Sequence, residues 1–290
     1  MVVKAERLPV PGETILGGDF LMAAGGKGAN QAVAAARLGG EVVFVGKVGD
    51  DIFGKQAVES FRREGIDTGY LRVDSENPSG VALITVDARG ENCIVVASGA
   101  NRNLLPADLP AEKIKNAALV LMQLEIPLET VEYVAEQASA HGVPVILNPA
   151  PACALPDSLL GNVSVLIPNQ QEAEMLTGVT IVDKVSAGRA AAALAGKGVK
   201  TVIITLGAKG ALILDQGNFE RVAAPAVEAV DTTAAGDVFC GALAVGLAEG
   251  RLLKDAVVFA CAAAAVSVTR MGAQPSAPTR GEVERFRDHL

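Results

Sequence analysis

Residues 119–125, LVLMQLE, form an apolar run of strand length that stops at a carboxylate. Three similar runs follow, separated by longer stretches with helical spacing: VPVIL at 143–147, VSVLI at 163–167 and TVIITL at 201–206. Runs that are largely apolar throughout, rather than at alternate positions, are typical of strands buried on both faces. Their alternation with helical stretches is typical of βαβ units. The sequence therefore predicts an α/β fold with a doubly wound, mainly parallel sheet flanked by helices.

Each of the four runs ends in residues that carry polar groups or expose the backbone. Glu125, Asn148 and Asn169 follow the first three runs, and Gly207 and Gly210 follow the fourth. Ligands of open parallel sheets bind beyond the carboxyl ends of the strands, so four such endings would meet at one crevice. Taken alone, each ending is more often an ordinary turn between a strand and a helix.

The overall composition narrows the class of protein. A length of 290 residues, half of them hydrophobic, suffices for one large domain, and no linker or internal repeat divides the chain. The net charge of −8 and the lack of a basic run argue against nucleic acid as a partner. No signal peptide or membrane-spanning stretch is evident, so a cytoplasmic protein is expected. The irregular spacing of the cysteines suggests reduced packing residues and no zinc site: Cys93, Cys153, Cys240 and Cys261.

The amino-terminal third differs, because its apolar segments are short and alternate with polar residues. Residues 81–86 and 93–97 flank Asp87–Gly90, whose composition is typical of a turn, and together they predict a β-hairpin. In an α/β chain such a hairpin can serve as a lid or a dimer surface, or it can simply extend an edge of the sheet.

Glycines lie at the start of one predicted helix. The stretch GGKGANQ, residues 25–31, leads into a strongly helix-forming run that ends at Gly39. Glycines let a ligand approach the backbone, and Lys27 and Asn30 supply donors beside the free N–H groups of the helix start. The spacing fits neither the P-loop nor the dinucleotide-binding pattern. A sugar or an anion could bind here, and a glycine-rich turn before a packed helix is the plainer alternative.

A second set of small residues, DTTAAGD at 231–237, precedes an apolar helical run at 238–248. Backbone N–H groups at this helix start could stabilise charge on a transferred phosphoryl group. Asp237 would be placed to accept a proton from an attacking hydroxyl, and an ordinary carboxylate suffices for that step. The alternative is that Asp237 merely caps the helix.

The stretches GGKGANQAVAAARLG at 25–39 and DTTAAGD at 231–237 closely resemble the two signature stretches of the ribokinase family of carbohydrate kinases. Further matching stretches extend over nearly the whole chain: LMQLE from 121, NPAPA from 148, PNQQEAE from 168, TLGAKG from 205 and TRMGAQPS from 269. The resemblance implies the fold of that family and transfer of the γ-phosphoryl group of ATP to the primary hydroxyl of D-ribose. Within the family, the ribose-specific members are more similar than the fructokinases, ketodeoxygluconate kinases or adenosine kinases. A sibling kinase for another sugar or nucleoside, and a catalytically impaired sugar-binding or nucleotide-binding protein, are the alternatives.

The resemblance also implies which residues form the site. Asp237 would deprotonate the attacking hydroxyl, and Ala235 and Gly236 would help to form an anion hole. The residues that match the family's sugar ligands are Gly25, Gly26, Lys27, Gly28, Asn30, Glu125 and again Asp237. The residues that match its nucleotide ligands are Asn169, Thr205, Leu206, Gly207, Ala208, Lys209, Gly210, Gly236 and Cys261.

Two kinds of cation are implied in the same way. Magnesium would accompany ATP, and Glu172 would organise it through water. A potassium ion would act as a monovalent activator beside the anion hole. The residues that match its ligands are Asp231, Thr233, Ser267, Arg270, Gly272 and Ser276.

By the same resemblance, the single domain of residues 1–290 carries a lid formed by about residues 10–24 and 80–98, which commonly also makes the contact of a homodimer. Members of the family normally begin with a core strand that ends in an Asn-x-Asp loop, whose Asp binds the sugar. Here residues 1–4, MVVK, resemble the segment just after that loop. We therefore expect Met1 to be an internal methionine of a longer natural enzyme.

Overall fold

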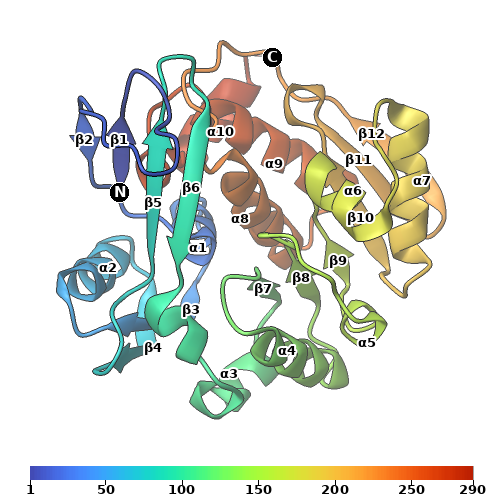
Figure 1. Cartoon of the computed structure of the whole chain (residues 1–290). Helices are drawn as coiled ribbons and strands as arrows, with labels where there is room; N and C mark the ends of the chain where they lie inside the picture. The colour runs from blue at the N-terminus through green and yellow to red at the C-terminus, as the bar shows by residue number, and fades with distance from the viewer. Residues whose placement is uncertain (290) are drawn as a thin grey trace.

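The structure, a computed structural model, describes residues 1–289 and has a six-stranded sheet at its centre (Figure 1). Strands β7 to β10 run parallel, and β11 and β12 continue the sheet antiparallel at one edge, in the order β12-β11-β10-β9-β8-β7. The strands are β7 (Val120–Met122), β8 (Val145–Leu147), β9 (Val165–Leu166), β10 (Thr201–Thr205), β11 (Ala211–Asp215) and β12 (Asn218–Val222). All four predicted apolar runs form adjacent parallel strands, so the predicted fold class is confirmed.

Side chains of these strands enter two separate cores, one on each face of the sheet. Ile203 packs in the first core, and its neighbours Val202 and Ile204 pack in the second. The first core is closed by α1 (Lys27–Arg37), α2 (Ile52–Arg63), α8 (Ala235–Ala248), α9 (Leu253–Ser267) and α10 (Arg280–Arg287). The second is closed by α3 (Ala111–Lys115), α4 (Leu128–Ala140), α5 (Asp157–Leu160), α6 (Gln170–Thr177) and α7 (Lys184–Ala195). Burial on both faces explains why the strand sequences are apolar almost without interruption.

A separate four-stranded sheet has the order β2-β1-β5-β6. It contains segments that the sequence analysis expected to form a lid, and it is called the lid sheet here for that reason only. Its strands are β1 (Val2–Lys4), β2 (Phe20–Leu21), β5 (Val81–Val86) and β6 (Asn92–Ala97). Strands β5 and β6 form the expected antiparallel hairpin, with Gly90 at a φ of 84° in its turn. Strand β1 pairs parallel with β5, so the sequence-based boundary at residue 10 left out a strand of this sheet. In the view of Figure 1 the lid sheet and the six-stranded sheet lie on opposite sides of α8.

Strands β3 (Val43–Gly49) and β4 (Asp67–Asp74) form a third sheet, a parallel pair. Within residues 1–289, no strand pairing joins this sheet to β7. Side chains of the first core that lie on β3 and β7, such as Phe44 and Leu121, are accordingly only partly buried. The first core is therefore less completely covered here than over β8 to β10.

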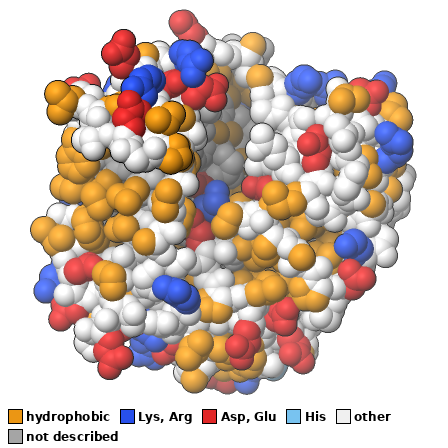
Figure 2. Space-filling model, in the orientation of Figure 1, with side chains coloured by type: hydrophobic (Ala, Val, Ile, Leu, Met, Phe, Trp, Pro, Cys, Tyr) orange, Lys and Arg blue, Asp and Glu red, His pale blue; other side chains and the backbone are white. Residues whose placement is uncertain are grey.

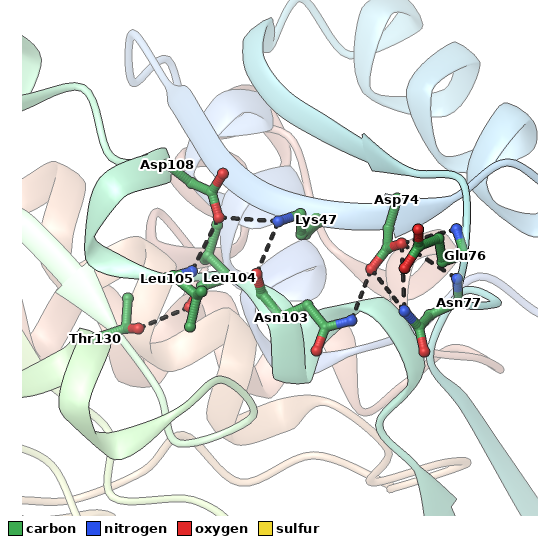
Figure 3. Close-up of polar contacts among 9 residues, drawn as sticks. All are labelled: Lys47, Asp74, Glu76, Asn77, Asn103, Leu104, Leu105, Asp108 and Thr130. Carbon is green, nitrogen blue, oxygen red and sulfur yellow. Dashed lines mark hydrogen bonds and ion pairs between the residues drawn. The ribbon is translucent and has the colours of Figure 1, made fainter.

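Polar contacts attach both connections of the lid hairpin to the β3–β4 pair. Before the hairpin, the N–H of Gly49, the last residue of β3, donates to the Ser79 hydroxyl at 3.0 Å. The carboxylate of Asp51, the N-cap of α2, accepts hydrogen bonds from the N–H and the hydroxyl of Ser79, each at 2.7 Å. After it, Asn103 donates to Asp74 at 2.7 Å, and Lys47 donates to the Asn103 carbonyl at 2.8 Å (Figure 3). The lid sheet is thus anchored on β3–β4 at both of these connections.

The cysteines correct one expectation from the sequence. Cys240 and Cys261 are buried in the first core, as packing residues are, whereas Cys93 and Cys153 are exposed. Cys93 lies on β6, where every residue is exposed, so this cysteine is not a core residue.

Among the residues that the structure describes, no helix has the length and hydropathy needed to cross a membrane.

Candidate active site

Helix α1 begins at the carboxyl end of strand β7. Gly26 precedes the helix with a φ of 92°, and the Lys27 N–H donates to Oε2 of Glu125 at 2.7 Å. A Cβ atom on Gly28 would lie 2.9 Å from the side-chain oxygen of Gln123, so a glycine lets the helix approach the strand end this closely. The predicted sugar-binding segment and Glu125 therefore meet, although Lys27 and Glu125 are 98 residues apart.

Helix α8 places Asp237 beside this segment. Ala234 occupies the N-cap position with a φ of 60°, and Asp237 lies in the first helical turn with 7% of its surface exposed. The Asp237 carboxylate accepts hydrogen bonds from Nδ2 of Asn30 at 2.8 Å and from Nε2 of Gln31 at 3.0 Å. No side chain of the described residues caps this helix end. The capping alternative is therefore wrong, because the carboxylate bonds instead to side chains of α1.

Three carboxylates surround a single lysine. Burial raises the pKa of Asp237, Glu125 and Glu172, and the charge of Asp237 raises the pKa of the other two further. The Lys27 ammonium opposes the rise of the pKa at all three groups, and the two amide hydrogen bonds oppose it at Asp237. Asp237, a buried carboxylate near the Lys27 ammonium, is therefore suited to accept a proton from a bound ligand that also carries negative charge.

The start of α8 presents backbone N–H groups to the same space. The Ala235 N–H donates to the Thr232 carbonyl at 3.2 Å, whereas the Gly236 N–H has no hydrogen-bond partner outside its helix among residues 1–289. A Cβ atom on Gly236 would meet nothing within 4 Å, so the space beside this residue is open. Gly236 therefore suits the predicted role in anion binding better than Ala235 does.

The predicted nucleotide segment lies at the carboxyl ends of β9 and β10. Asn169 forms a β-bridge with Thr205, which joins the two strand endings. The Asn169 side chain accepts from the Glu172 N–H at 2.8 Å, and Glu172 accepts from the Asn169 N–H at 2.8 Å. This capping box occupies the amide oxygen of Asn169 and leaves its amide nitrogen to contact a ligand. Lys209 is exposed, as a surface charge would be.

An apolar hollow adjoins the loop after β10. Gly210, at a φ of 88°, lies so close to β12 that a Cβ atom would be 2.0 Å from the Val222 carbonyl oxygen. The chain after Val222 lines a hollow of about 360 Å³, whose walls are Ala223, Ala224, Pro225, Val258, Ala262 and Arg287. Walls of this kind suit a flat apolar ring. Cys261 precedes Ala262 but is itself buried in the first core, where burial raises the pKa of its thiol to about 11.

Asp231 ties together segments that carry the predicted potassium ligands. Its carboxylate accepts from the N–H of Thr233 at 2.9 Å and from the N–H of Gly272 at 2.8 Å. The Arg270 guanidinium donates to Glu282 at 2.6 Å, so only the backbone oxygen of this residue suits a cation. The two serines of the set are fully buried. The atoms of this set that could contact a cation are oxygen atoms, which hard cations prefer.

The sequence analysis did not identify the contact of Gln31 with Asp237, although Gln31 belongs to the quoted stretch at residues 25–31. This side chain is 1% exposed and contacts Asp237, which is 206 residues away. The available signal was a polar side chain within an alanine-rich helix. The walls of the apolar hollow were missed too, because small apolar residues in an Ala-rich chain give no local signal.

Comparisons with known proteins find relatives over nearly the whole chain. It matches the pfkB family of carbohydrate kinases over residues 1–280. It is 46% identical to the ribokinase of Haemophilus influenzae over 290 residues, which cover 99% of this chain and 95% of that protein. It is 39% identical to the deoxyribokinase of Salmonella typhi over 293 residues, which cover 100% of this chain and 95% of that protein. The structure of Arabidopsis thaliana ribokinase complexed with ribose and ATP is 37% identical, with a TM-score of 0.92 over 98% of this chain and 94% of that one.

Proposed function

Because the chain belongs to the pfkB family of carbohydrate kinases, we propose that it transfers the γ-phosphoryl group of ATP to the primary hydroxyl of D-ribose, giving D-ribose 5-phosphate and ADP. The observation that carries this proposal is the buried Asp237 carboxylate, held by two amides at the start of α8. The family relation supports the choice of reaction, and the relatives named as ribokinases support the choice of sugar.

In this reaction Asp237 accepts the proton of the primary hydroxyl as its oxygen attacks the γ-phosphorus atom, and ADP leaves. The transition state is loose, so correct placement of the hydroxyl contributes more than a strong base would. The Gly236 N–H and the positive end of the α8 dipole stabilise the charge on the transferred group. Lys27, which lies near Asp237, adds a positive charge on the same side.

Asn30 is the side chain best prepared to bind the sugar. Its Nδ2 atom donates to Asp237 at 2.8 Å, while its Oδ1 atom is buried and has no partner among residues 1–289. A buried acceptor without a donor is costly, and a sugar hydroxyl would satisfy it. Glu125 and the backbone at Gly25 and Gly26 supply further contacts at the start of α1.

The residues present fit the two cations that the family implies. Magnesium is proposed to arrive with ATP, because this ion is usually held by substrate phosphates together with only one or two carboxylates. Glu172, which is 9% exposed, would hold water molecules of that ion. Potassium would bind to the oxygen atoms around Asp231 and strengthen the positive potential beside the anion hole. ATP as the phosphoryl donor also fits the cytoplasmic location expected from the sequence.

The direct test is ADP release from Mg-ATP, measured with D-ribose, with 2-deoxy-D-ribose and without sugar. We expect turnover that depends on ribose and that falls when potassium is replaced by tetramethylammonium. Faster turnover with 2-deoxyribose would support the alternative of a sibling kinase, for which the 39% identical deoxyribokinase is the precedent. ATP binding without turnover on any sugar would instead favour a catalytically impaired binding protein.

We also propose that the chain forms a homodimer through the lid sheet. Strand β6 is an edge strand, and Ile94, Val95 and Val96 are exposed by 51%, 61% and 59%. An edge strand that exposes adjacent apolar side chains on both of its faces is poorly protected in a monomer. Figure 2 shows hydrophobic side chains gathered over this part of the molecule. A second copy of the lid sheet would cover these side chains and also hold the lid in place.

The Val95→Glu variant is expected to weaken this dimer by about 10- to 100-fold, because a carboxylate would be buried against an apolar partner. Analytical ultracentrifugation over a range of protein concentrations measures the change. Val73→Glu is the matched control, because Val73 is 59% exposed on β4, outside the lid sheet. A monomeric parent protein, or equal weakening by both substitutions, would contradict the lid-sheet dimer.

A further inference from the structure

The side chain of Gln31 has every polar atom committed inside the protein. Its Nε2 atom donates to Oδ1 of Asp237 at 3.0 Å and to Oδ1 of Asn148 at 3.1 Å. Its Oε1 atom accepts a hydrogen bond from Nε2 of Gln123. An amide nitrogen has two hydrogens, so both donors are used, and the position of the acceptors fixes which way the amide faces. Gln31 is therefore held in one orientation and has no donor left for a ligand.

The partners of Gln31 connect Asp237 to the ends of three strands. Gln123 follows β7, and Asn148 follows β8. Asn148 in turn donates through Nδ2 to the carbonyl of Ile167, just after β9, at 3.0 Å. The chain of amides contains no group that ionises near neutral pH. It can therefore fix a geometry without exchanging a proton with the carboxylate.

The neighbouring residue Asn30 shows the contrast. Asn30 also donates to Asp237, but its buried Oδ1 atom has no partner, so this side chain retains a group for a ligand. Gln31 retains none. Two adjacent amides of α1 thus bind the two oxygens of one carboxylate, and only one of them is equipped to contact substrate as well.

We propose that Gln31 is a positioning residue for Asp237: it fixes the orientation of this carboxylate by linking it, through Gln123 and Asn148, to the ends of β7 and β8. The proposal rests on the function proposed above, because it assigns Asp237 the role of base. A carboxylate on a helix start could rotate about its side-chain bonds. Anchoring to strand ends removes this freedom before substrate binds, which is the purpose of support around a reacting group.

The pH dependence follows from the groups that face Asp237. These are Lys27 on α1, Glu172 on α6, Glu125 after β7 and Cys240 on α8. Burial raises the pKa of Asp237, and the Gln31 hydrogen bond lowers it by favouring the ionised form. Removal of that bond raises the pKa further. The base is then protonated at a higher pH, so activity is lost earlier as the solution is acidified.

The test is Gln31→Met, which keeps the length of the side chain and removes its polar atoms. We expect kcat to fall by about 10- to 100-fold, the effect of losing one hydrogen bond to a charged group. The KM for the sugar should stay within about twofold, because Gln31 has no group left for substrate. The acid limb of the kcat profile should move to higher pH. Gln56→Met, on the exposed face of α2, is the matched control.

A carbon-13 titration of the Asp237 carboxyl carbon, assigned with Asp237→Asn, measures the same pKa change without any turnover. A higher pKa in Gln31→Met than in Gln56→Met supports the proposal even if ribose is not the substrate, so failure of the assigned sugar is a separate result. An unchanged pKa and pH profile would refute it. A raised KM with unchanged kcat would refute it too, because Gln31 would then be a sugar ligand. If Gln31→Met does not fold, Gln123→Met carries the test, with a smaller shift in the same direction expected.

Discussion

The Asp237→Asn variant is expected to fold normally and to bind nucleotide, yet to lose about 10²- to 10⁴-fold in kcat. The substitution preserves the shape of the side chain and removes its capacity to accept a proton. The amide of Asn30 can turn to accommodate it, because its Oδ1 atom has no partner at present and could accept from the new amide. We therefore expect the stability of the fold to change little, whereas the reaction lacks the group that accepts the proton.

Single-turnover kinetics with Mg-ATP and ribose, together with ADP binding by calorimetry, separates the two effects. Asp255→Asn is a matched control, because Asp255 lies in the first turn of α9 as Asp237 does in that of α8, but is exposed. The control should retain nearly full turnover. Near-normal turnover in Asp237→Asn would remove this residue from the role of base, and loss of nucleotide binding would show that its contribution is to the fold.

The four parallel strands of the six-stranded sheet were predictable because their signal is local, whereas the antiparallel strands β11 and β12 were not predicted. Strands buried on both faces must be apolar throughout, and the runs at 143–147 and 201–206 are recognisable without any knowledge of their neighbours. The strand endings were predictable for a related reason. Parallel strands share one carboxyl edge, so Glu125 and Asn148 had to lie near one another once the sheet was accepted.

The lid sheet and the surroundings of Asp237 depend on pairings that the local sequence does not specify. Strand β1 has only three residues, and it joins the lid sheet through contacts with β5, about eighty residues further along the chain. Gln31 reads as one more residue of an amphipathic helix until α8 is packed against α1. The exposure of Cys93 depends on the edge position of β6, which its sequence does not reveal. The pairing of β1, the role of Gln31 and the exposure of Cys93 are therefore set by long-range packing, which the local sequence pattern does not specify.

The contact between α1 and α8 has one position where packing leaves no space. A Cβ atom on Gly241 would lie 2.6 Å from the Gln31 carbonyl oxygen and 2.9 Å from the Cβ atom of Ala34. The obstacle is largely helix backbone, which cannot move aside as a flexible side chain can. The glycine therefore determines how closely α8, which carries Asp237, approaches the helix that holds it.

The Gly241→Ala variant is expected to lower the free energy of unfolding by about 1–3 kcal/mol, because the added methyl group forces the two helices apart. Helix propensity acts in the opposite direction, since alanine is favoured over glycine inside a helix by about 1 kcal/mol. A net loss would thus show that overpacking outweighs propensity. Thermal and urea unfolding measure it, and kcat should fall as well, because Asn30 and Gln31 lie on one of the displaced helices and Asp237 on the other.

Gly161→Ala is the matched control, because its nearest atoms would be at ordinary contact distances of 3.5 Å and 3.9 Å and its backbone is in the right-handed helical region. That substitution should leave stability unchanged or raise it slightly. Equal stability of Gly241→Ala and the parent protein would mean that α1 and α8 can separate without cost. The carboxylate and its two amides would then not be held by the packing of these helices, and their geometry would have to depend on the hydrogen bonds alone. A loss of kcat that exceeds the loss of folded protein would show the reverse, with helix packing serving directly to place the base.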